Sequence, residues 1–361
     1  MTANIDDAGI EDVSIEDELR TQIRAVAASG AEIEIIGGGS KRFYGESIEA
    51  LPIDVSAHSG IIDYDPAELV ITLRAGCKLH EVEALLAKNR QMFGFEPPCF
   101  GADATIGGML ATGLAGPRRA YAGSIRDFVL GVKMLDGRGE VLQFGGRVIK
   151  NVAGFDVSRV MVGALGTLGV ILEVSIRVIP VFETELTLGY AHASADEHIQ
   201  WINGLGSEPY PITASQWQGG RSQLRLSGSE QGVSHAASLL GGDSIEPDWQ
   251  DLKEQQLDFF DSEQPLSRIS LPPTSPDILP DTQQLIEWGG AQRWCRGEID
   301  VAALREQVAG LGGSLCAFRN HAAEVPIFHP LPAAMLKLQR NIKSSFDPAG
   351  IFNPGKMYPG L

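Results

Sequence analysis

The sequence predicts an α+β protein with two unequal domains and a closing C-terminal segment. With 361 residues, 43% of them hydrophobic, the chain is long enough to build two cores. Strand and helix patterns alternate along it, but residues 181–325 are richer in Trp, Gln and Ser and have weaker glycine motifs than the part before them. We therefore expect domains at 1–180 and 181–325, followed by a segment at 326–361.

The first part opens with apolar side chains at helical spacing in residues 15–29. The turn sequence at 136–139 (DGRG) separates two apolar runs and predicts a β-hairpin. An alternating run at 170–178 predicts a long strand that stops at Pro180, because proline lacks the N–H that a ladder needs. The expected strands are 32–36, 69–73, 128–135, 140–144 and 170–178, and the expected helices are 15–29, 78–90 and 156–162.

The second part repeats this alternation. Its expected strands are 185–189, 223–226, 267–271 and 314–318, and its expected helices are 195–205, 233–240 and 301–311. The closing segment begins with a helical pattern at 333–345. It then places three prolines in its last 14 residues beside Ile351, Phe352 and Met357, which indicates an ordered irregular backbone rather than a disordered tail.

Composition excludes several classes of function. A net charge of −17 argues against nucleic acid and anionic membrane surfaces as partners, because both need basic patches. The four cysteines form no C-x-x-C pair, so we expect no metal site and reduced thiols. No signal peptide and no run of 18 apolar residues is present. We expect a cytoplasmic protein without a membrane span, with any contact to the inner membrane made through partners.

Two glycine-rich segments indicate a ligand that carries phosphates. Residues 35–42 read IIGGGSKR, and residues 104–113 read ATIGGMLATG. Glycine lets backbone N–H groups approach phosphate oxygens, because no Cβ intervenes. Two such segments suit a dinucleotide. The NAD fingerprint G-x-G-x-x-G fails because its sixth position is Arg42, and no P-loop spacing occurs anywhere in the chain.

The order of the remaining motifs resembles a known family. After the two glycine segments come GPRR at 116–119, GSIRD at 123–127, KNVAGFD at 150–156 and GTLGVI at 166–171, and the chain closes with NPGK at 353–356. Together they resemble the FAD-binding domain of the vanillyl-alcohol oxidase / p-cresol methylhydroxylase flavoprotein superfamily. The resemblance implies a two-part FAD-binding domain with a small α+β cap domain. Within the superfamily the chain is most similar to the family of FAD-binding subunits of bacterial glycolate oxidase.

The resemblance implies which residues hold FAD. Lys356 is the cation expected near the flavin, and Asn353 either approaches the ring or caps a turn. The implied FAD-binding residues are Gly37, Gly38, Gly39, Ser40, Lys41, Thr105, Ile106, Gly107, Gly108, Thr112, Gly116, Ser124, Val170, Ile171, Asn353 and Lys356. Relatives that attach FAD covalently carry a histidine in or just after the first glycine segment. This chain has none there, and Cys99 is expected to be a buried thiol, so we expect non-covalent FAD.

The resemblance also implies partners: a larger FAD-binding catalytic subunit and an iron–sulfur subunit, which together oxidise glycolate or a related 2-hydroxy acid and pass electrons to an acceptor other than NAD. Catalytic residues are unknown; Arg319, His321 and His329 are weak candidates, because they lack the histidine cluster of related dehydrogenases. Three alternatives stay open. In the first, the chain is a subunit of the glycolate oxidase complex, where it either binds substrate or only relays electrons. In the second, it works alone on a 2-hydroxy acid or another alcohol. In the third, it is a non-catalytic scaffold.

Overall fold

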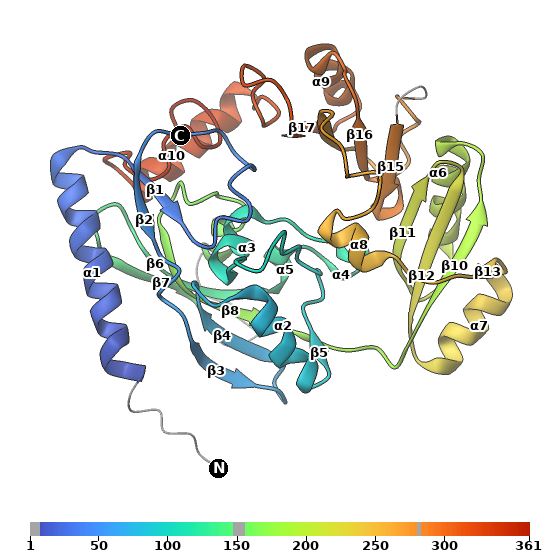
Figure 1. Ribbon diagram of the computed structural model, residues 1–361, viewed down its shortest axis with the longest axis horizontal. Coiled ribbons are helices and arrows are strands. Elements are labelled where there is room, and N and C mark those ends of the chain that lie inside the picture. The colour runs from blue at the N-terminus through green and yellow to red at the C-terminus, as the bar shows by residue number, and fades with distance from the viewer. Residues whose placement is uncertain (1–7, 147–155, 280–282) are drawn as a thin grey trace.

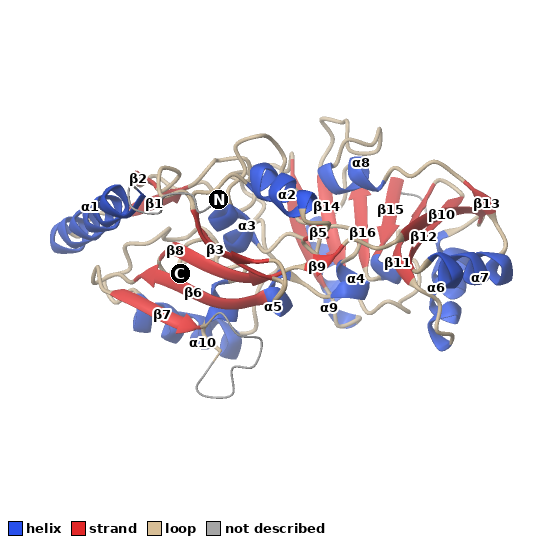
Figure 2. Ribbon diagram, turned by 90° about the horizontal axis from the view of Figure 1, so that it is seen from below, coloured by secondary structure: helices blue, strands red, loops and turns tan. Residues whose placement is uncertain are grey.

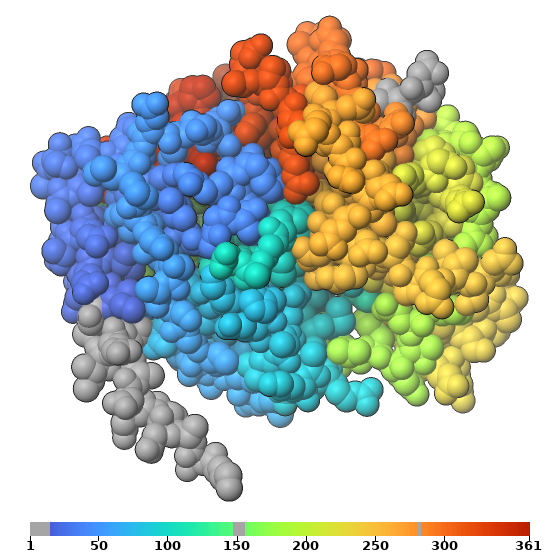
Figure 3. Space-filling view, viewed as in Figure 1, coloured from blue at the N-terminus to red at the C-terminus, as the bar shows by residue number. Residues whose placement is uncertain are grey.

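The computed structural model describes residues 8–146, 156–279 and 283–361. The chain forms two sheet-based halves side by side, and the C-terminal segment returns to the first half (Figure 1). In the space-filling view the first half, in blue and cyan, packs directly against the second half, in green to orange (Figure 3). The site described below lies in the first half and on its side facing the second.

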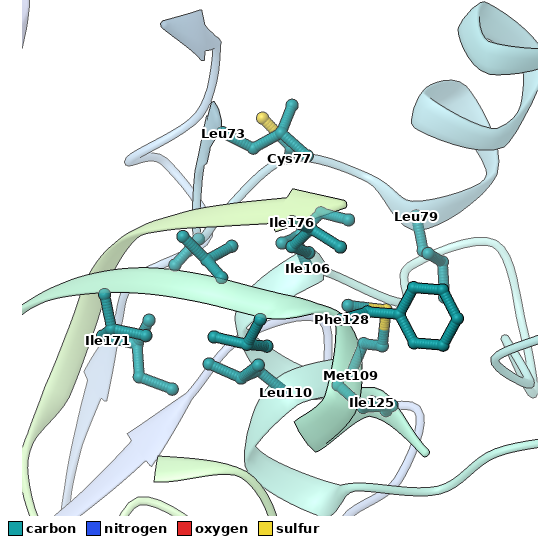
Figure 4. Packing of buried hydrophobic residues seen from close by; sticks show 14 of the residues in the cluster. Leu73, Cys77, Leu79, Ile106, Met109, Leu110, Ile125, Phe128, Ile171 and Ile176 are labelled. Atoms are coloured by element: carbon teal, nitrogen blue, oxygen red, sulfur yellow. The ribbon is translucent and has the colours of Figure 1, made fainter. Parts of the chain in front are cut away.

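The first half is built on a five-stranded antiparallel sheet. In spatial order its strands are β3 (Ile61–Asp65), β4 (Val70–Arg74), β8 (Val170–Arg177), β6 (Val129–Leu135) and β7 (Val141–Gly145). The helices α2 (Leu79–Lys88), α3 (Ile106–Thr112) and α5 (Ile125–Phe128) contribute to its core (Figure 4). The hairpin expected around residues 136–139 is confirmed as β6–β7.

A smaller layer covers one end of this half. The strands β1 (Ile33–Ile36) and β2 (Leu51–Asp54) pair in parallel, and the helix α1 (Ala8–Ser29) packs beside them. The helix expected at 15–29 thus begins earlier, at Ala8. Short elements complete the half: β5 (Gln91–Met92), α4 (Arg119–Ala122), the 3₁₀ turn η1 (Ser158–Met161) where a helix was expected, and β9 (Ile179–Pro180).

The second half is an eight-stranded sheet. In spatial order its strands are β13 (Asp243–Ser244), β10 (Thr184–Ala191), β12 (Arg221–Gly228), β11 (Ile212–Gln218), β15 (Gln283–Glu287), β16 (Gln292–Arg296), β14 (Leu266–Ser270) and β17 (Ser314–Arg319). All four expected strands and three expected helices are present. The strands β11, β13, β15 and β16 were not expected, and neither was the helix α8 (Trp249–Glu254).

Most helices of the second half cover one face of this sheet. The helices α6 (Ala195–Gly204), α7 (Glu230–Leu240) and α9 (Val301–Gly310) lie below it in Figure 2, and the 3₁₀ turns η2 (Leu205–Ser207) and η3 (Trp288–Gly290) follow α6 and β15. The opposite face packs against α8 and against side chains of the first half, including Tyr44 and Leu114. The second sheet therefore forms a wall beside the first half.

Buried ion pairs join the two halves. The Glu96 carboxylate accepts hydrogen bonds from Arg118 (Nε, 3.2 Å) and from Arg225 (Nη2, 3.0 Å) on β12. Both arginines are almost fully buried, at 2% and 3% exposed, so the pairs are shielded from water. Arg118 also donates to Glu185 on β10 at 2.8 Å.

The C-terminal segment closes the first half. The helix α10 (Ala333–Phe346) leads into Asp347, whose carboxylate accepts the N–H groups of Ile351 (3.1 Å) and Phe352 (2.8 Å). The backbone then runs along β1: Ile33 donates to the Ile351 carbonyl, and Asn353 donates to the Ile33 carbonyl, both at 2.8 Å. The prolines and buried apolar residues of the tail thus belong to an ordered strand-like return.

Candidate functional site

The two glycine-rich segments meet at a cleft of about 820 Å³, which we call the glycine cleft. It lies where the end of β1, the start of α3 and the C-terminal return come together. Its walls are lined by Glu34, Ile35, Ile36, Gly37, Gly38, Gly39, Ser40, Lys41, Arg42, Tyr44, Val55, Ala75, Thr105, Gly107, Gly108, Ala111, Thr112, Leu165, Gly166, Gly169, Ile171, Asn353 and Lys356.

The first glycine segment presents free backbone donors. The strand β1 ends at Ile36, and the chain turns at once through Gly39, whose φ of +72° suits glycine. From Gly37 to Lys41 no backbone N–H donates to any described residue; the next one, of Arg42, donates to the Gly39 carbonyl at 3.2 Å. Successive unpartnered N–H groups on a turn form a concave anion-binding site.

The second glycine segment behaves differently, because its backbone donors are already used. Thr105 caps α3, and its Oγ1 accepts the Gly108 N–H at 3.2 Å. The Gly107 N–H donates to the Ala75 carbonyl at 2.7 Å, and the Ile106 N–H donates to the Cys77 carbonyl at 2.9 Å. This segment therefore forms a wall, and the anion donors come from the first segment.

Close packing explains two of the glycines. A Cβ at Gly38 would lie 1.4 Å from the Asp103 carbonyl oxygen, and one at Gly107 would lie 2.8 Å from the Ala75 Cβ. Gly108 differs, because Thr105 Oγ1, at 3.2 Å, is the single described atom within 4 Å of its Cβ position. Gly38 and Gly107 are thus required by the fold, whereas Gly108 leaves open space on the cleft side.

The third wall comes from the C-terminal return. Asn353 Oδ1 accepts the Ile35 N–H at 2.8 Å, and its Nδ2 donates to the Leu165 carbonyl at 2.6 Å. Gly166 has a φ of +72°, and a Cβ there would lie 2.6 Å from Asn353 Nδ2. Asn353 therefore ties β1 to the loop before β8, which makes it a structural element of the wall.

Charged side chains gather at one side of the glycine cleft. The buried Glu34 pairs with Lys356 (3.4 Å) and with the exposed Arg42. Lys41 Nζ donates to the Cys99 carbonyl at 3.0 Å and lies 5.6 Å from the centre of the Phe100 ring. Burial lowers the pKa of Lys41 to about 8, so the amine stays mostly protonated at neutral pH but loses its proton more readily than an ordinary lysine.

Most of the expected FAD-binding residues line this cleft. They are Gly37, Gly38, Gly39, Ser40, Lys41, Thr105, Gly107, Gly108, Thr112, Ile171, Asn353 and Lys356. Several of their side chains bond within the protein: the Ser40 hydroxyl donates to the Cys99 carbonyl (2.9 Å), and the Thr112 hydroxyl donates to the Gly108 carbonyl (2.9 Å). For these two residues the backbone, more than the hydroxyl, is available to a ligand.

Four expected residues lie elsewhere. Ile106 points into the core of the first half (Figure 4), and Val170 belongs to the core beside β1. The Ser124 hydroxyl is bonded to Asp127 at 2.9 Å, and Gly116 packs against the Glu96 carbonyl. The expected motif at 150–155 lies outside the described residues.

A groove adjoins the cleft and shares Glu34, Arg42 and Lys356 with it. Of the candidate catalytic residues, Arg319 and His321 line this groove and His329 does not. Arg319 lies over the Phe43 ring at 4.4 Å, and the His321 Nε2 is 3.1 Å from the Ser267 hydroxyl. His329 Nδ1 accepts the Leu315 N–H at 3.3 Å. The three residues do not converge on one point.

Sequence reasoning missed Tyr44, Arg268 and Glu287. Tyr44 lines the glycine cleft, and Arg268 and Glu287 line a smaller pocket behind it, between the first half and the second sheet. Arg268 Nη2 donates to the Tyr44 hydroxyl at 2.7 Å. Arg268 sits in an ordinary alternating strand, so no local signal marks it.

Two further findings concern metals and membranes. Within the described ranges, no group of three His, Cys, Asp or Glu side chains is placed to hold a metal ion. Among the helices that the structure describes, none combines the length and apolar character needed to span a bilayer.

Comparison with known proteins agrees with this geometry. The protein-family model described as an FAD binding domain matches residues 12–145. The chain is 41% identical over 344 residues to the glycolate oxidase subunit GlcE of Escherichia coli (strain K12), covering 95% of this chain and 97% of that protein. It is also 30% identical over 146 residues to the glycolate oxidase subunit GlcD of Bacillus subtilis (strain 168), covering 40% of this chain and 31% of that protein.

Solved structures give the same fold. A structure of alkyldihydroxyacetonephosphate synthase matches with a TM-score of 0.64 and 16% identity, over 94% of this chain and 74% of that one. At that identity the likeness establishes architecture alone. The near full-length similarity to the Escherichia coli protein establishes more: this chain belongs to the family of the glycolate oxidase subunit GlcE, and its N-terminal part is an FAD-binding domain.

Proposed function

We propose that this chain is the FAD-binding subunit of a glycolate oxidase complex, which oxidises glycolate or a related 2-hydroxy acid and passes the electrons to an iron–sulfur subunit. The observation that carries the proposal is the run of N–H groups from Gly37 to Lys41 that have no partner among the described residues, at the edge of the glycine cleft. The 41% identity to a glycolate oxidase subunit supports the choice of reaction.

In this proposal the pyrophosphate of FAD rests on the backbone from Gly37 to Lys41, and Thr105 to Thr112 form the facing wall. Bound flavin supplies the acceptor for two electrons. The chain supplies rigid walls and charge: Lys356, held by Glu34, is a cation beside the cofactor that would stabilise a reduced, anionic ring. The division at 1–180, 181–325 and 326–361 is part of the proposal, and the two separate sheets support it.

We propose non-covalent attachment. None of the seven histidines of the chain lines the glycine cleft. Cys99, expected to be a buried thiol, is only half-buried, because it lies at the boundary where the chain meets Glu83 and Glu254. It does not line the cleft either, and its Sγ lies 3.7 Å from Glu83 Oε2. Burial, followed by the charges of Glu83 and Glu254, raises the pKa of Cys99 to about 11, so it stays a weakly nucleophilic thiol at neutral pH. Acid precipitation should release FAD into the supernatant, and flavin left on the precipitated chain would contradict this part.

The expected partners are a larger FAD-binding catalytic subunit and the iron–sulfur subunit, in the cytoplasm, with any contact to the inner membrane made through them. Purification of the tagged chain together with its neighbouring gene products, followed by flavin and iron quantification, tests this. Recovery of flavin and iron with glycolate-dependent dye reduction supports the complex. A colourless chain would favour the scaffold alternative, and turnover by the chain alone would favour a stand-alone enzyme.

A further inference from the structure

The C-terminal segment forms a basic surface on an acidic chain. The chain carries 46 Asp and Glu in 361 residues, yet from residue 325 to residue 361 the single acidic side chain is Asp347. Asp347 is 2% exposed and accepts a hydrogen bond from Lys343 Nζ at 2.8 Å, whereas Lys337 and Arg340 are exposed. Charges more than about 8 Å apart are largely screened at physiological salt. This local positive sign, more than the net charge of −17, therefore decides what the surface attracts.

The helix α10 also exposes apolar side chains on this surface. Met335 is 46% exposed and Leu338 is 50% exposed, and they lie one helical turn apart on the same side of the helix. Among the large apolar residues exposed in the described ranges, no other two share a helix. The C-terminal half of α10, by contrast, packs Ile342 and Phe346 against the core of the first half. Its N-terminal half thus presents an apolar pair among cations, which is typical of a protein contact surface.

The groove beside the glycine cleft lies next to α10. It measures about 1320 Å³, and residues between 317 and 327 form one of its walls. The chain leaves this wall and enters α10, and β17 and α10 both lie on the upper side of the molecule in Figure 1. The C-terminal return fixes the connection: the Tyr358 hydroxyl donates to the His329 carbonyl at 3.1 Å, and Arg340 Nη2 donates to the Pro359 carbonyl at 3.2 Å. The groove and the exposed half of α10 together are called the basic face below.

Arg319 is a cation held in this groove by aromatic packing. Its guanidinium lies over the rings of Phe43 (4.4 Å), Phe100 (5.0 Å) and Phe318 (5.4 Å). Among the described residues, none accepts a hydrogen bond from its side chain, and no carboxylate lies within 4.0 Å of it. A stacked guanidinium with its N–H groups available suits recognition of a carboxylate through two hydrogen bonds.

The other charges of the groove are already paired within the chain. Arg42 and Lys356, which line the groove with Arg319, both pair with Glu34. The second carboxylate of the groove, Glu46, accepts the Ile327 N–H at 2.7 Å. Arg319 is thus the cation that the described part of the groove leaves without a counter-ion, so the groove is complementary to an acidic group.

We propose that the basic face is the docking surface for the iron–sulfur subunit, and that an acidic side chain of that subunit pairs with Arg319. This inference rests on the proposed function and deepens it, because it names the surface through which the complex passes electrons. The groove shares Glu34, Arg42 and Lys356 with the glycine cleft, so a subunit seated there lies beside the cofactor site. Met335 and Leu338 supply the apolar contact, and Arg319 supplies the charged anchor, a residue type enriched at the centres of interfaces.

The test is co-purification of the tagged full-length chain with its neighbouring gene products, with the iron recovered per chain as the readout. Leu338→Asp places a charge in the apolar part of the basic face, and Arg319→Glu reverses the charge of the anchor. Each should reduce iron recovery at least about 10-fold, because an unpaired or like charge at the centre of an interface is costly. Leu338 is half exposed, so Leu338→Asp should fold normally and remains the test if Arg319→Glu does not fold.

Leu239→Asp and Arg221→Glu are the matched controls. Leu239 is 61% exposed on α7, Arg221 is exposed at the start of β12, and neither belongs to the basic face. Both substitutions should leave iron recovery unchanged. The FAD content of each variant, purified without partners, should equal that of the wild type, because none of the four residues lines the glycine cleft. A loss of iron is then distinguished from a loss of cofactor.

The outcomes separate this inference from the proposed function. Unchanged iron recovery in Leu338→Asp and Arg319→Glu would overturn the docking surface and leave the complex standing, as would equal losses in the control variants. A wild-type chain that binds FAD but recovers no iron would overturn the complex and the docking surface together. If Leu338→Asp lost binding to phosphatidylglycerol vesicles, or Arg319→Glu lost binding of glycolate, while iron recovery stayed intact, the surface would belong to a membrane or to a small acid instead.

Discussion

The backbone at Gly38 touches the backbone at Asp103 so closely that a Cβ on Gly38 would lie 1.4 Å from the Asp103 carbonyl oxygen. The two glycine segments are thus held together by direct packing before any ligand binds. The cleft between them is preformed, and its donors come from one side only. This geometry decides which glycine substitutions should impair ligand binding and which should destabilise the fold.

Gly38→Ala should disrupt the fold locally. The added methyl group overlaps backbone atoms that cannot rotate away, so the two segments must separate, and we expect a loss of about 3 kcal/mol in unfolding free energy together with loss of bound FAD. Urea unfolding followed by flavin absorbance measures both. Gly204→Ala is the control and should be neutral or stabilising, because outside its own helix no described residue has an atom within 4 Å of its Cβ position. A fully stable Gly38→Ala would contradict the packing argument.

Gly108→Ala should separate cofactor binding from stability. The methyl group meets Thr105 Oγ1 at 3.2 Å and otherwise enters the cleft, so FAD affinity should fall at least about 10-fold while the helix gains up to about 1 kcal/mol. Thermal unfolding and FAD titration of the apoprotein measure the two effects. Gly107→Val is less informative, since it would collide with Ala75 whether or not FAD binds.

Gly232→Ala is a matched control for Gly108→Ala. Gly232 occupies the same place in α7, where its N–H donates to the capping Ser229 Oγ at 3.2 Å and its Cβ position lies 3.1 Å from that atom. It should gain similar stability and leave FAD binding unchanged. Equal FAD affinity in Gly108→Ala and Gly232→Ala would contradict a role for Gly108 in FAD binding.

Glu96→Gln should loosen the contact between the halves. It removes the buried carboxylate that Arg118 and Arg225 share and leaves them the half-exposed Glu185, at 2.8 Å and 3.9 Å, which should cost up to about 3 kcal/mol in urea unfolding. Burial acts to raise the pKa of Glu96, but Arg225 and Arg118 outweigh it and hold the pKa below 4.5. The ionised Glu96 therefore stabilises the folded protein above pH 4.5, and this stabilisation is lost as the pH falls through the pKa that Glu96 has in the folded state.

Glu140→Gln is the control for Glu96→Gln. Glu140 pairs with Arg24 at 2.9 Å, but both side chains are more than half exposed, so its loss should change stability by less than about 0.5 kcal/mol. Equal effects of the two substitutions would contradict a special role for the buried pair. Acid sensitivity should also be reduced in Glu96→Gln and unchanged in Glu140→Gln.

Glu287 should give the protein a second, opposite pH dependence. Its pKa is raised from 4.5 to about 7 in the folded chain, so the folded state binds the extra proton. The contribution of protonated Glu287 to the free energy of unfolding is complete below pH 4.5. It is lost as the pH rises toward 7 and beyond, by up to about 3 kcal/mol. Glu287→Gln should flatten the fall in melting temperature between pH 5 and pH 8. An unchanged slope would contradict the raised pKa.

Elements that depend on interactions between residues close in sequence could be predicted, and elements that depend on distant partners could not. The hairpin at 136–139 and the helices α2, α6, α7 and α9 depend on turn chemistry and periodicity within a few residues, so the sequence indicates them. The strand β2 contains Pro52 and only four residues, and β15 and β16 lack a clear alternation. Those strands exist because neighbouring strands supply hydrogen bonds and packing, which a local pattern does not record.

By itself, the sequence determined the α+β class, the family and the two glycine segments, because these features depend on local composition and on the order of the motifs. Only the tertiary structure decided which segment offers its donors, since the α3 N–H groups are consumed by Ala75 and Cys77, residues from another part of the chain. It likewise brought Arg268 to Tyr44 across 224 positions. Whether a polar group is satisfied or free depends on distant partners, and no local pattern carries that information.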